Sequence, residues 1–322
     1  MKKIINRIAP VLLMVWLVLQ SVSATQLLVP GGQVIGLALA DNTVTVASFD
    51  PALGEPAKTA GVKVGDRIVS VDEKQIFSAE DIRFALTHSD GSVEIGILRD
   101  GKAKKVRLEP VITEEGPRLG IYLKQGVTGI GTITWYDADT GRFAALGHGV
   151  NNANGDPVVM ETGSAFSAGV VSVQKGVAGD PGQLMGTLTD KDPIGVLSKN
   201  TPQGVFGKLD TVVSGEPIPV GSAQNVTVGP AVIRSTIADN AVQEYSVEIL
   251  KIYPNSSVTG RNILLKVTDP RLLETTGGIV QGMSGSPIIQ DGKLVGAVTH
   301  VLVNDPTTGY GIFIENMLDA AA

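Results

Sequence analysis

The sequence contains no cysteine among its 322 residues. This absence excludes disulfide bonds, thiolate nucleophiles, iron–sulfur clusters and cysteine-based zinc sites. Histidine is also scarce: only His88, His148 and His300 occur, and none belongs to an H-E-x-x-H segment. The sequence therefore predicts no metal site. It also lacks a G-x-x-x-x-G-K-[ST] segment and a complete G-x-G-x-x-G segment, so we expect no cofactor.

Aromatic residues make up only 4% of the chain, and no cluster of basic and aromatic residues accompanies the net charge of −6. A nucleic acid is therefore not an expected partner. Glycine is abundant, with 39 residues beside 17 prolines and no G-X-Y repeat. This composition is typical of many short strands joined by tight turns, so we expect a mostly β protein.

Residues 1–24 have the pattern of a secretory signal. Lys2, Lys3 and Arg7 precede an apolar run over 8–19, and Ala24 ends a stretch of small residues at which cleavage is expected. The alternative is an uncleaved anchor, although the run is shorter than the roughly 20 residues that cross a bilayer. Both alternatives predict export across the cytoplasmic membrane, and a retained segment also predicts membrane association through the N-terminus.

The next segment alternates short apolar runs with turn signals. A helix is expected over 79–88, because apolar residues recur at helical spacing after Ser78 as N-cap, with Asp81 at the third helical position. The apolar runs predict strands at 44–49, 66–71, 92–98 and 105–111. A small sheet covered by one helix follows from this order.

The segment AGVKVGDRIVSV at 60–71 resembles the A-G-x-x-x-G-D-x-I-x-x-V signature of PDZ domains in bacterial proteases. The resemblance implies a PDZ-like domain over 31–112 that binds peptide C-termini. Its carboxylate-binding loop would be formed by Ile35, Gly36 and Leu37, since successive free amides hold an anion and a strand edge accepts a peptide. The alternative is that Ile35 and Leu37 are core residues of an edge strand.

A charged segment over 113–118, broken by Gly116-Pro117, marks a domain boundary. The second domain is expected over 118–319. Its strands recur at short spacing, which indicates a sandwich or a barrel rather than βαβ units. They are expected at 129–137, 158–163, 169–176, 225–237, 242–253, 262–269, 286–301 and 309–314.

The segment GMSGSP at 282–287 carries the candidate chemistry. A serine peptidase needs an activated hydroxyl and main-chain N–H donors for the oxyanion, and glycines on both sides of Ser284 permit the required turn. The segment and its following hairpin resemble trypsin-like enzymes, which implies a double β-barrel and an oxyanion hole made by the amides of Gly282 and Ser284. The alternatives are a plain Gly/Ser-rich turn, or Ser286 as a weaker nucleophile.

A serine hydroxyl requires a general base, and histidine is the usual one. His148, in ALGHG, lies ahead of Ser284 as in the trypsin-like chain order, whereas His300 follows it. We therefore favour His148, with His300 as the competitor. A carboxylate should orient the imidazole, and the residues leave five candidates open: Asp137, Asp139, Asp156, Asp180 and Asp269.

The blocks GIGTITWYDADTGRFAALGHGV (129–150) and GGIVQGMSGSPIIQDGKLVGAVTHVLVNDPTTGYGIFIENML (277–318), with the PDZ segment and the N-terminal signal, resemble the SpoIVB peptidase family of endospore-forming bacteria. In that family the triad aspartate comes shortly before the serine, which implies Asp269 as the third member beside His148 and Ser284. This departs from the wider trypsin-like pattern, in which the acid lies farther upstream.

The family resemblance also implies a role in spore formation. Such a protein is released from the forespore into the intermembrane space and cleaves the exterior part of a membrane-bound regulator. The cut frees an intramembrane protease complex to process a sigma factor, and family members also cut themselves near the N-terminus. Two other functions stay open: a non-catalytic PDZ scaffold that tethers a membrane complex, and a Ser-Lys peptidase.

Overall fold

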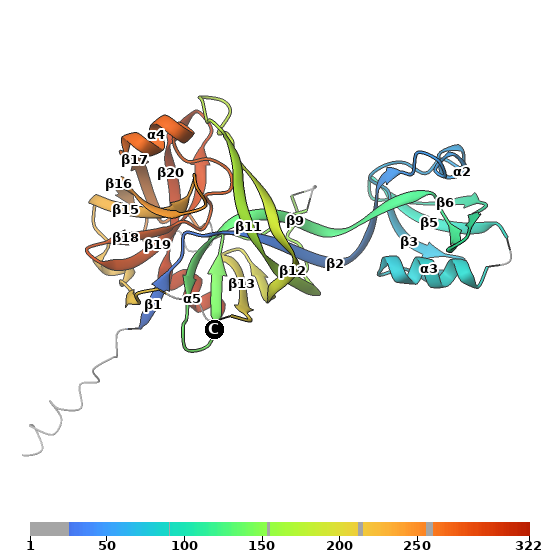
Figure 1. Cartoon of the computed structure of the whole chain (residues 1–322), viewed down its shortest axis with the longest axis horizontal. Helices are drawn as coiled ribbons and strands as arrows, with labels where there is room; N and C mark the ends of the chain where they lie inside the picture. Colours follow the sequence, from blue (N-terminus) through green and yellow to red (C-terminus); the bar gives the residue numbers. More distant parts are fainter. Residues whose placement is uncertain (1–25, 90, 153–154, 212–214, 256–259) are drawn as a thin grey trace, which may run out of the picture.

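The structure is a computed structural model that describes residues 26–89, 91–152, 155–211, 215–255 and 260–322. The predicted signal or anchor over 1–24 lies outside these residues. Strands dominate the chain, and two β-barrels form one body from which a smaller β domain extends on a two-stranded arm (Figure 1). The expected mostly β class is confirmed. Within the described ranges, no helix is both long enough and apolar enough to span a membrane.

The first barrel is a ring of six antiparallel strands. Its strands are, in ring order, β2 (Val34–Phe49), β9 (Ile121–Tyr136), β10 (Arg142–Ala145), β13 (Gly204–Leu209), β12 (Gln183–Thr201) and β11 (Thr162–Gln174). Each strand pairs with the next, and the pairing of β11 with β2 closes the ring. Apolar side chains such as Leu37, Phe143 and Val205 fill it. Two short strands, β1 (Leu27–Pro30) and β14 (Ile218–Pro219), continue the sheet from β9.

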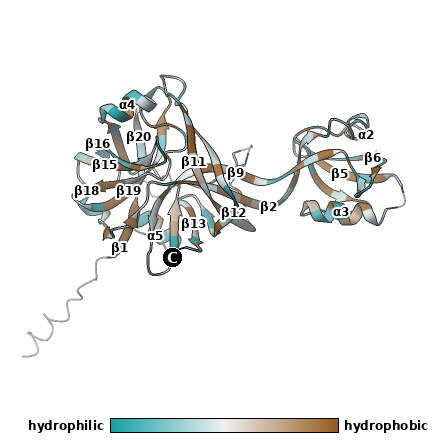
Figure 2. Ribbon diagram, viewed as in Figure 1, coloured by the Kyte–Doolittle hydropathy of each residue, from teal (hydrophilic) through white to brown (hydrophobic). Residues whose placement is uncertain are grey.

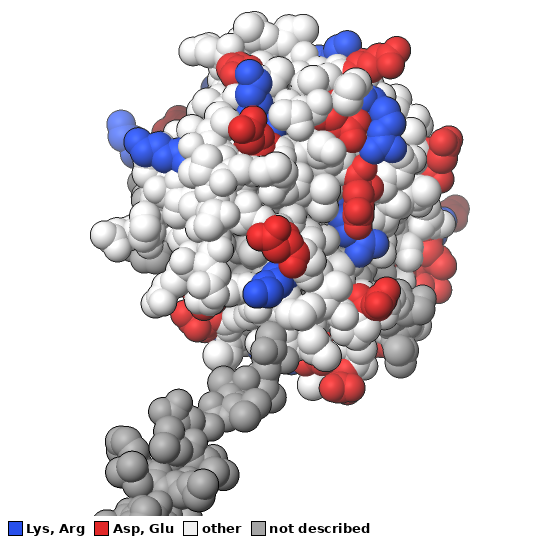
Figure 3. Space-filling model, turned by 90° about the vertical axis from the view of Figure 1, so that its left-hand side faces the viewer, with Lys and Arg blue, Asp and Glu red and all other residues white. Residues whose placement is uncertain are grey.

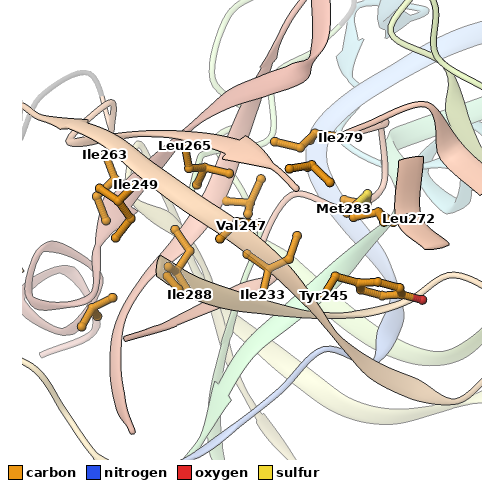
Figure 4. Close-up of a cluster of buried hydrophobic side chains, with 14 of the residues drawn as sticks. Ile233, Tyr245, Val247, Ile249, Ile263, Leu265, Leu272, Ile279, Met283 and Ile288 are labelled. Atoms are coloured by element: carbon orange, nitrogen blue, oxygen red, sulfur yellow. The ribbon is translucent and has the colours of Figure 1, made fainter. Parts of the chain in front are cut away.

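The second barrel is closed as well. Its strands are, in order, β15 (Gly229–Thr236), β16 (Val242–Ile252), β17 (Ile263–Val267), β20 (Asp305–Phe313), β19 (Lys293–Leu302) and β18 (Pro287–Gln290). Alternate residues of β16, Tyr245, Val247 and Ile249, point into the core that Figure 4 shows. The helical segments are η1 (Ala223–Asn225), α4 (Pro270–Thr276) and α5 (Ile314–Ala321). The expected trypsin-like double β-barrel is therefore confirmed.

The smaller domain has the expected sheet and helix around its own core. Helix α3 (Ala79–Thr87) begins at Ser78, whose hydroxyl accepts from the Asp81 amide while the Asp81 carboxylate accepts from the Ser78 amide, as the sequence predicts. The remaining elements are α2 (Glu55–Thr59), β3 (Arg67–Val71), β4 (Lys74–Gln75), β5 (Val93–Arg99), β6 (Lys102–Leu108), β7 (Val111–Thr113) and β8 (Gly116–Arg118).

The boundary between the two domains differs from the predicted one. The first half of β2, over 34–39, belongs to the first barrel, and its second half, over 44–49, belongs to the smaller domain. Likewise β9 starts in the smaller domain, where Leu119 and Ile121 join the core, and ends in the barrel. The smaller domain is therefore an insertion within the first barrel and does not precede it, because two continuous strands cross the boundary.

Hydropathy and charge follow this architecture. The strands carry brown, apolar stretches (Figure 2), and buried apolar side chains form the cores of both barrels. On the face of the double barrel shown in Figure 3, Lys and Arg lie next to Asp and Glu on a mostly uncharged surface. This face therefore carries no extended patch of one sign.

Candidate active site

The loop that carries Ser284 lies at the junction of the two barrels, just before β18. Gly282 and Gly285 both have φ of +98°, a backbone conformation that L side chains rarely adopt. Between them Met283 is fully buried in the second barrel (Figure 4). Because Met283 points inward, its neighbour Ser284 is left partly exposed at the surface of the junction. The sequence pattern G-M-S-G thus makes a turn that presents a serine.

The two predicted oxyanion donors are available. In the described part of the chain, neither the N–H of Gly282 nor that of Ser284 donates a hydrogen bond, although the neighbouring amides of Met283 and Gly285 donate to Val280 and Val298. Free amides on a rigid loop can stabilise a developing negative charge on a substrate oxygen.

The structure brings the His148 loop to the serine loop. In β9, the carbonyl of Thr132 accepts from the Leu146 amide at 3.2 Å and the Thr132 amide donates to the Ser284 carbonyl at 3.0 Å. Leu146 and Gly147, at φ of +71° and +68°, turn the chain so that His148 follows at the same junction. One strand residue therefore ties both candidate loops together.

His148 and His300 lie side by side. Their ring centroids are 5.4 Å apart, and Nδ1 of His148 is 2.9 Å from the Gly149 carbonyl oxygen. The Ser284 hydroxyl donates to the Thr299 carbonyl at 2.9 Å, so in this structure it is bonded to the residue next to His300 and not to an imidazole. The hydroxyl must leave Thr299 before a histidine can accept its proton.

Burial keeps both imidazoles neutral. It lowers the pKa of His148, an effect partly offset by the hydrogen bond to Gly149. The pKa of His300 is lowered to about 4, first by burial and then by the neighbouring His148 and Arg261. A neutral imidazole can accept a proton from a hydroxyl, which is what a general base must do.

Asp269 lies at the start of α4, where its carboxylate caps the helix and pairs with Arg271. It is the N-cap of α4, and its carboxylate accepts from the amides of Ser246 and Arg271 and from the Arg271 guanidinium, with the closest charged contact at 2.8 Å. Within the described residues, no carboxylate is hydrogen-bonded to His148. The assignment of Asp269 as the triad acid therefore disagrees with this structure, because Arg271 and the helix end already bind the carboxylate.

The Asp269–Arg271 pair gives a pH-dependent prediction. Hydrogen bonds from Arg271 lower the pKa of Asp269 to about 2, so its contribution to stability is present above the unfolded value of 3.8 and is lost as the pH falls toward 2. Asn is an equally good N-cap, so Asp269→Asn keeps the cap but removes the charge and one of the two acceptor oxygens that bind Arg271 and Ser246. We expect the variant to be less stable at pH 7 by about 1 kcal/mol, a value reduced by the exposure of Arg271.

Denaturant unfolding of both proteins at a series of pH values measures this difference. It should shrink toward zero between about pH 4 and pH 2. A difference that stays constant down to pH 2 would contradict the assigned interaction.

The predicted peptide-binding loop of the PDZ-like domain is wrong. Ile35, Gly36 and Leu37 pair with β11 on one side and with β9 on the other, so both edges of this stretch are occupied inside the first barrel. Ile35 and Leu37 are buried there. The alternative that they are core residues is closer to the structure, although the strand is not an edge strand.

A groove of about 700 Å³ lies instead between α3 and the start of β9. Ile82 and Leu86 line it from the helix, and Ile121 and Leu123 from the strand. This stretch of β9 pairs with β2 on one edge, and no strand of the described part pairs with its other edge. A free edge beside an apolar helix face is the arrangement that accepts an extended peptide. The groove could not be predicted from the sequence, because Gly116-Pro117 indicates a linker there.

Comparisons with known proteins find two families along the chain. A family model described as SpoIVB peptidase S55 matches residues 115–318, and a PDZ domain model matches residues 33–109. A putative zinc metalloprotease of Agrobacterium fabrum is 31% identical over 124 residues, which are 37% of this chain and 32% of that protein. One of Staphylococcus aureus is 37% identical over 81 residues, 25% of this chain and 19% of that protein. The chain thus spans a third or less of these relatives.

Solved structures show weaker likeness. The active form of the Rv3671c protease from M. tuberculosis is 14% identical with a TM-score of 0.36, covering 60% of this chain and 72% of that one. The HtrA-type protease AlgW with decapeptide is 12% identical with a TM-score of 0.37, covering 65% and 57%. The PDZ domain of the SdrC-like protein from Listeria monocytogenes is 22% identical with a TM-score of 0.22, covering 26% and 87%.

Proposed function

We propose, since the chain belongs to the SpoIVB peptidase S55 family and is a PDZ-containing serine peptidase, that it is an exported endopeptidase acting during spore formation. Its substrate is the extracytoplasmic part of a membrane-bound regulator of an intramembrane protease complex, and it also cuts itself. Cleavage of the regulator then permits sigma-factor processing. The place of action is the intermembrane space of the forespore, with membrane association through the N-terminus.

The observation that carries the proposal is the junction of the two barrels. There the amides of Gly282 and Ser284 donate no hydrogen bond to any described residue. The His148 loop is tied to the serine loop through Thr132. In the proposed mechanism His148 takes the Ser284 proton, the hydroxyl oxygen attacks the scissile carbonyl, and the Gly282 and Ser284 amides stabilise the oxyanion. The protonated imidazole then gives its proton to the leaving amine. Water repeats these steps to release the acyl group.

The groove beside α3 gives the inserted domain its part in this function. Its open strand edge and the apolar side chains of Ile82 and Leu86 suit an extended peptide C-terminus. Arg118 at the groove carries a positive charge that favours a terminal carboxylate, although Glu115 pairs with it. We infer that this groove, and not the segment at Ile35, binds peptides.

A second function is favoured by two specific observations. The Ser284 hydroxyl is bonded to Thr299, and no carboxylate in the described ranges orients His148. Both features suit a non-catalytic PDZ scaffold that tethers a membrane signalling complex. This alternative predicts that the protein binds the regulator and never cuts it.

Cleavage of a purified regulator tests the proposal. The exterior domain of a membrane-bound regulator from the same organism is incubated with the full chain, and mass spectrometry identifies any new N-terminus. We expect one cut by the natural protein and stable binding without a cut by Ser284→Ala, which keeps the fold. Binding without cleavage by both proteins would support the scaffold instead, and absence of both would remove this substrate.

A further inference from the structure

Four consecutive peptide groups, from Gln281 to Gly285, form the loop that presents Ser284. In the first group the Gln281 carbonyl accepts from the Leu184 amide at 2.8 Å, and in the third the Met283 carbonyl accepts from the Ser286 amide at 3.0 Å. These two groups carry the free N–H donors of Gly282 and Ser284. As far as the described residues go, each donor group is therefore anchored only through its carbonyl.

The other two peptide groups are anchored at both ends. The Met283 N–H donates to Val280 at 3.1 Å, and the Gly285 N–H donates to Val298 at 2.7 Å. Their carbonyls, on Gly282 and Ser284, are both held by one residue: Oγ1 of Thr132 donates to the Gly282 carbonyl at 2.8 Å, and its amide donates to the Ser284 carbonyl at 3.0 Å.

Thr132 is placed to resist any rotation of this loop. It is fully buried in β9 of the first barrel, whereas the loop belongs to the second barrel. A carbonyl without its donor at such a site would turn toward another partner, because buried polar groups left unpaired are costly. Rotation of the Gly282 or Ser284 carbonyl would also turn the N–H groups on either side of it, and thus redirect the oxyanion donors.

We propose that Thr132 is a positioning residue for the peptidase reaction, which fixes the orientation of the Gly282 and Ser284 amides from the opposite barrel. This inference rests on the proposed role of Ser284 as nucleophile. Thr132 is fully buried and is hydrogen-bonded to the carbonyls of Gly282 and Ser284, so it acts through the loop. Its side chain supplies one of the two bonds, so a change of side chain tests that bond while the amide remains.

The experiment compares the full chain with Thr132→Val, Thr132→Ser and Thr128→Val. A fluorophosphonate probe gives the limiting labelling rate of Ser284 and the probe concentration for half that rate. Thr132→Val should lower the limiting rate on the order of 10–100-fold, somewhat below the loss on removing an oxyanion donor itself. The half-saturating concentration should stay within about twofold, because the free-enzyme binding surface is unchanged.

Thr132→Ser keeps the hydroxyl and should restore the rate to within about threefold. Thr128 is on the same strand but exposed, so Thr128→Val should label at the natural rate. Natural labelling by Thr132→Val, or equally slow labelling by Thr132→Ser or Thr128→Val, would overturn the proposal.

A second measurement does not depend on catalysis. Hydrogen exchange of the Met283 and Gly285 amides should be faster in Thr132→Val than in the natural protein, with thermal unfolding confirming that both are folded. Unchanged exchange would overturn the positioning role. If the natural protein is never labelled, the proposed function fails, and this exchange result then decides the role of Thr132 by itself.

Discussion

Replacement of Ser284 by alanine is expected to abolish proteolysis, self-cleavage and labelling by a fluorophosphonate probe, with a fall in kcat on the order of 10⁵–10⁶. The reason is covalent: without the Ser284 oxygen no acyl-enzyme forms, and only the oxyanion amides and substrate binding remain. The side chain is partly exposed, and within the part of the chain that the structure describes it is hydrogen-bonded only to the Thr299 carbonyl. Its removal should therefore leave the fold intact, as circular dichroism and thermal unfolding would confirm.

Ser286 supplies the matched control in the same loop. It is fully buried, and its hydroxyl has no hydrogen-bond partner among the described residues. Ser286→Ala removes this unpaired group and should leave labelling and cleavage within about twofold of the natural protein. Residual cleavage by folded Ser284→Ala at more than a hundredth of the natural rate would contradict the assignment of Ser284 as the nucleophile. Loss of labelling in Ser286→Ala would indicate that Ser286 is the nucleophile instead.

Replacement of Gly285 by alanine is expected to lower the free energy of unfolding by about 4–5 kcal/mol or more, which is enough to prevent stable folding. A β-carbon at this position would lie 2.0 Å from the Thr132 carbonyl oxygen and 2.5 Å from the Leu146 nitrogen. Both are main-chain atoms of the first barrel, so no side chain can move aside. The loop and β9 would have to separate, with loss of the hydrogen bonds between them.

Gly292→Ala is the control that distinguishes the effect of this clash from the effect of backbone strain. Its φ is +70°, but a β-carbon there would meet nothing within 4 Å. Gly292→Ala should therefore cost only the left-handed backbone strain, about 1–2 kcal/mol. Denaturant unfolding of both variants measures the two values. Equal losses in the two variants would show that the contact between Gly285 and the first barrel does not matter.

Several elements could be predicted because their signals are local. Ser78 and Asp81 form the expected cap of α3, since a capping box depends only on residues three apart. The turn at Ser284 follows from glycines at 282 and 285, both of which have positive φ. The Asp291-Gly292 turn of the β18–β19 hairpin is equally local: both residues have positive φ, and the flanking strands pair across the turn.

Other features could not be predicted, because strand pairing is not encoded locally. The alternating segment at Ile35 suits an edge strand, a groove wall or a barrel strand, and only the pairing of Ile35 with Ser167 and Gly131 in the neighbouring strands places it. Asp269 has the spacing of a triad acid in the resembled family, but Arg271, two residues later, binds its carboxylate. Thr132 gives no signal at all in the sequence.

The sequence by itself determined that this is a mostly β protein with a PDZ-like segment, and that Ser284 sits in a turn made by two glycines. The β class and the turn depend on composition, alternation and backbone preference within a few residues, whereas the PDZ-like segment depends on its resemblance to a family signature. The tertiary structure alone decided that the PDZ domain is inserted through β2 and β9. It also decided that the groove of this domain lies between α3 and β9, and that Thr132 holds the serine loop. Closing each barrel selects one register among many, and contacts across 150 positions, such as Thr132 to Gly282, exist only after that selection.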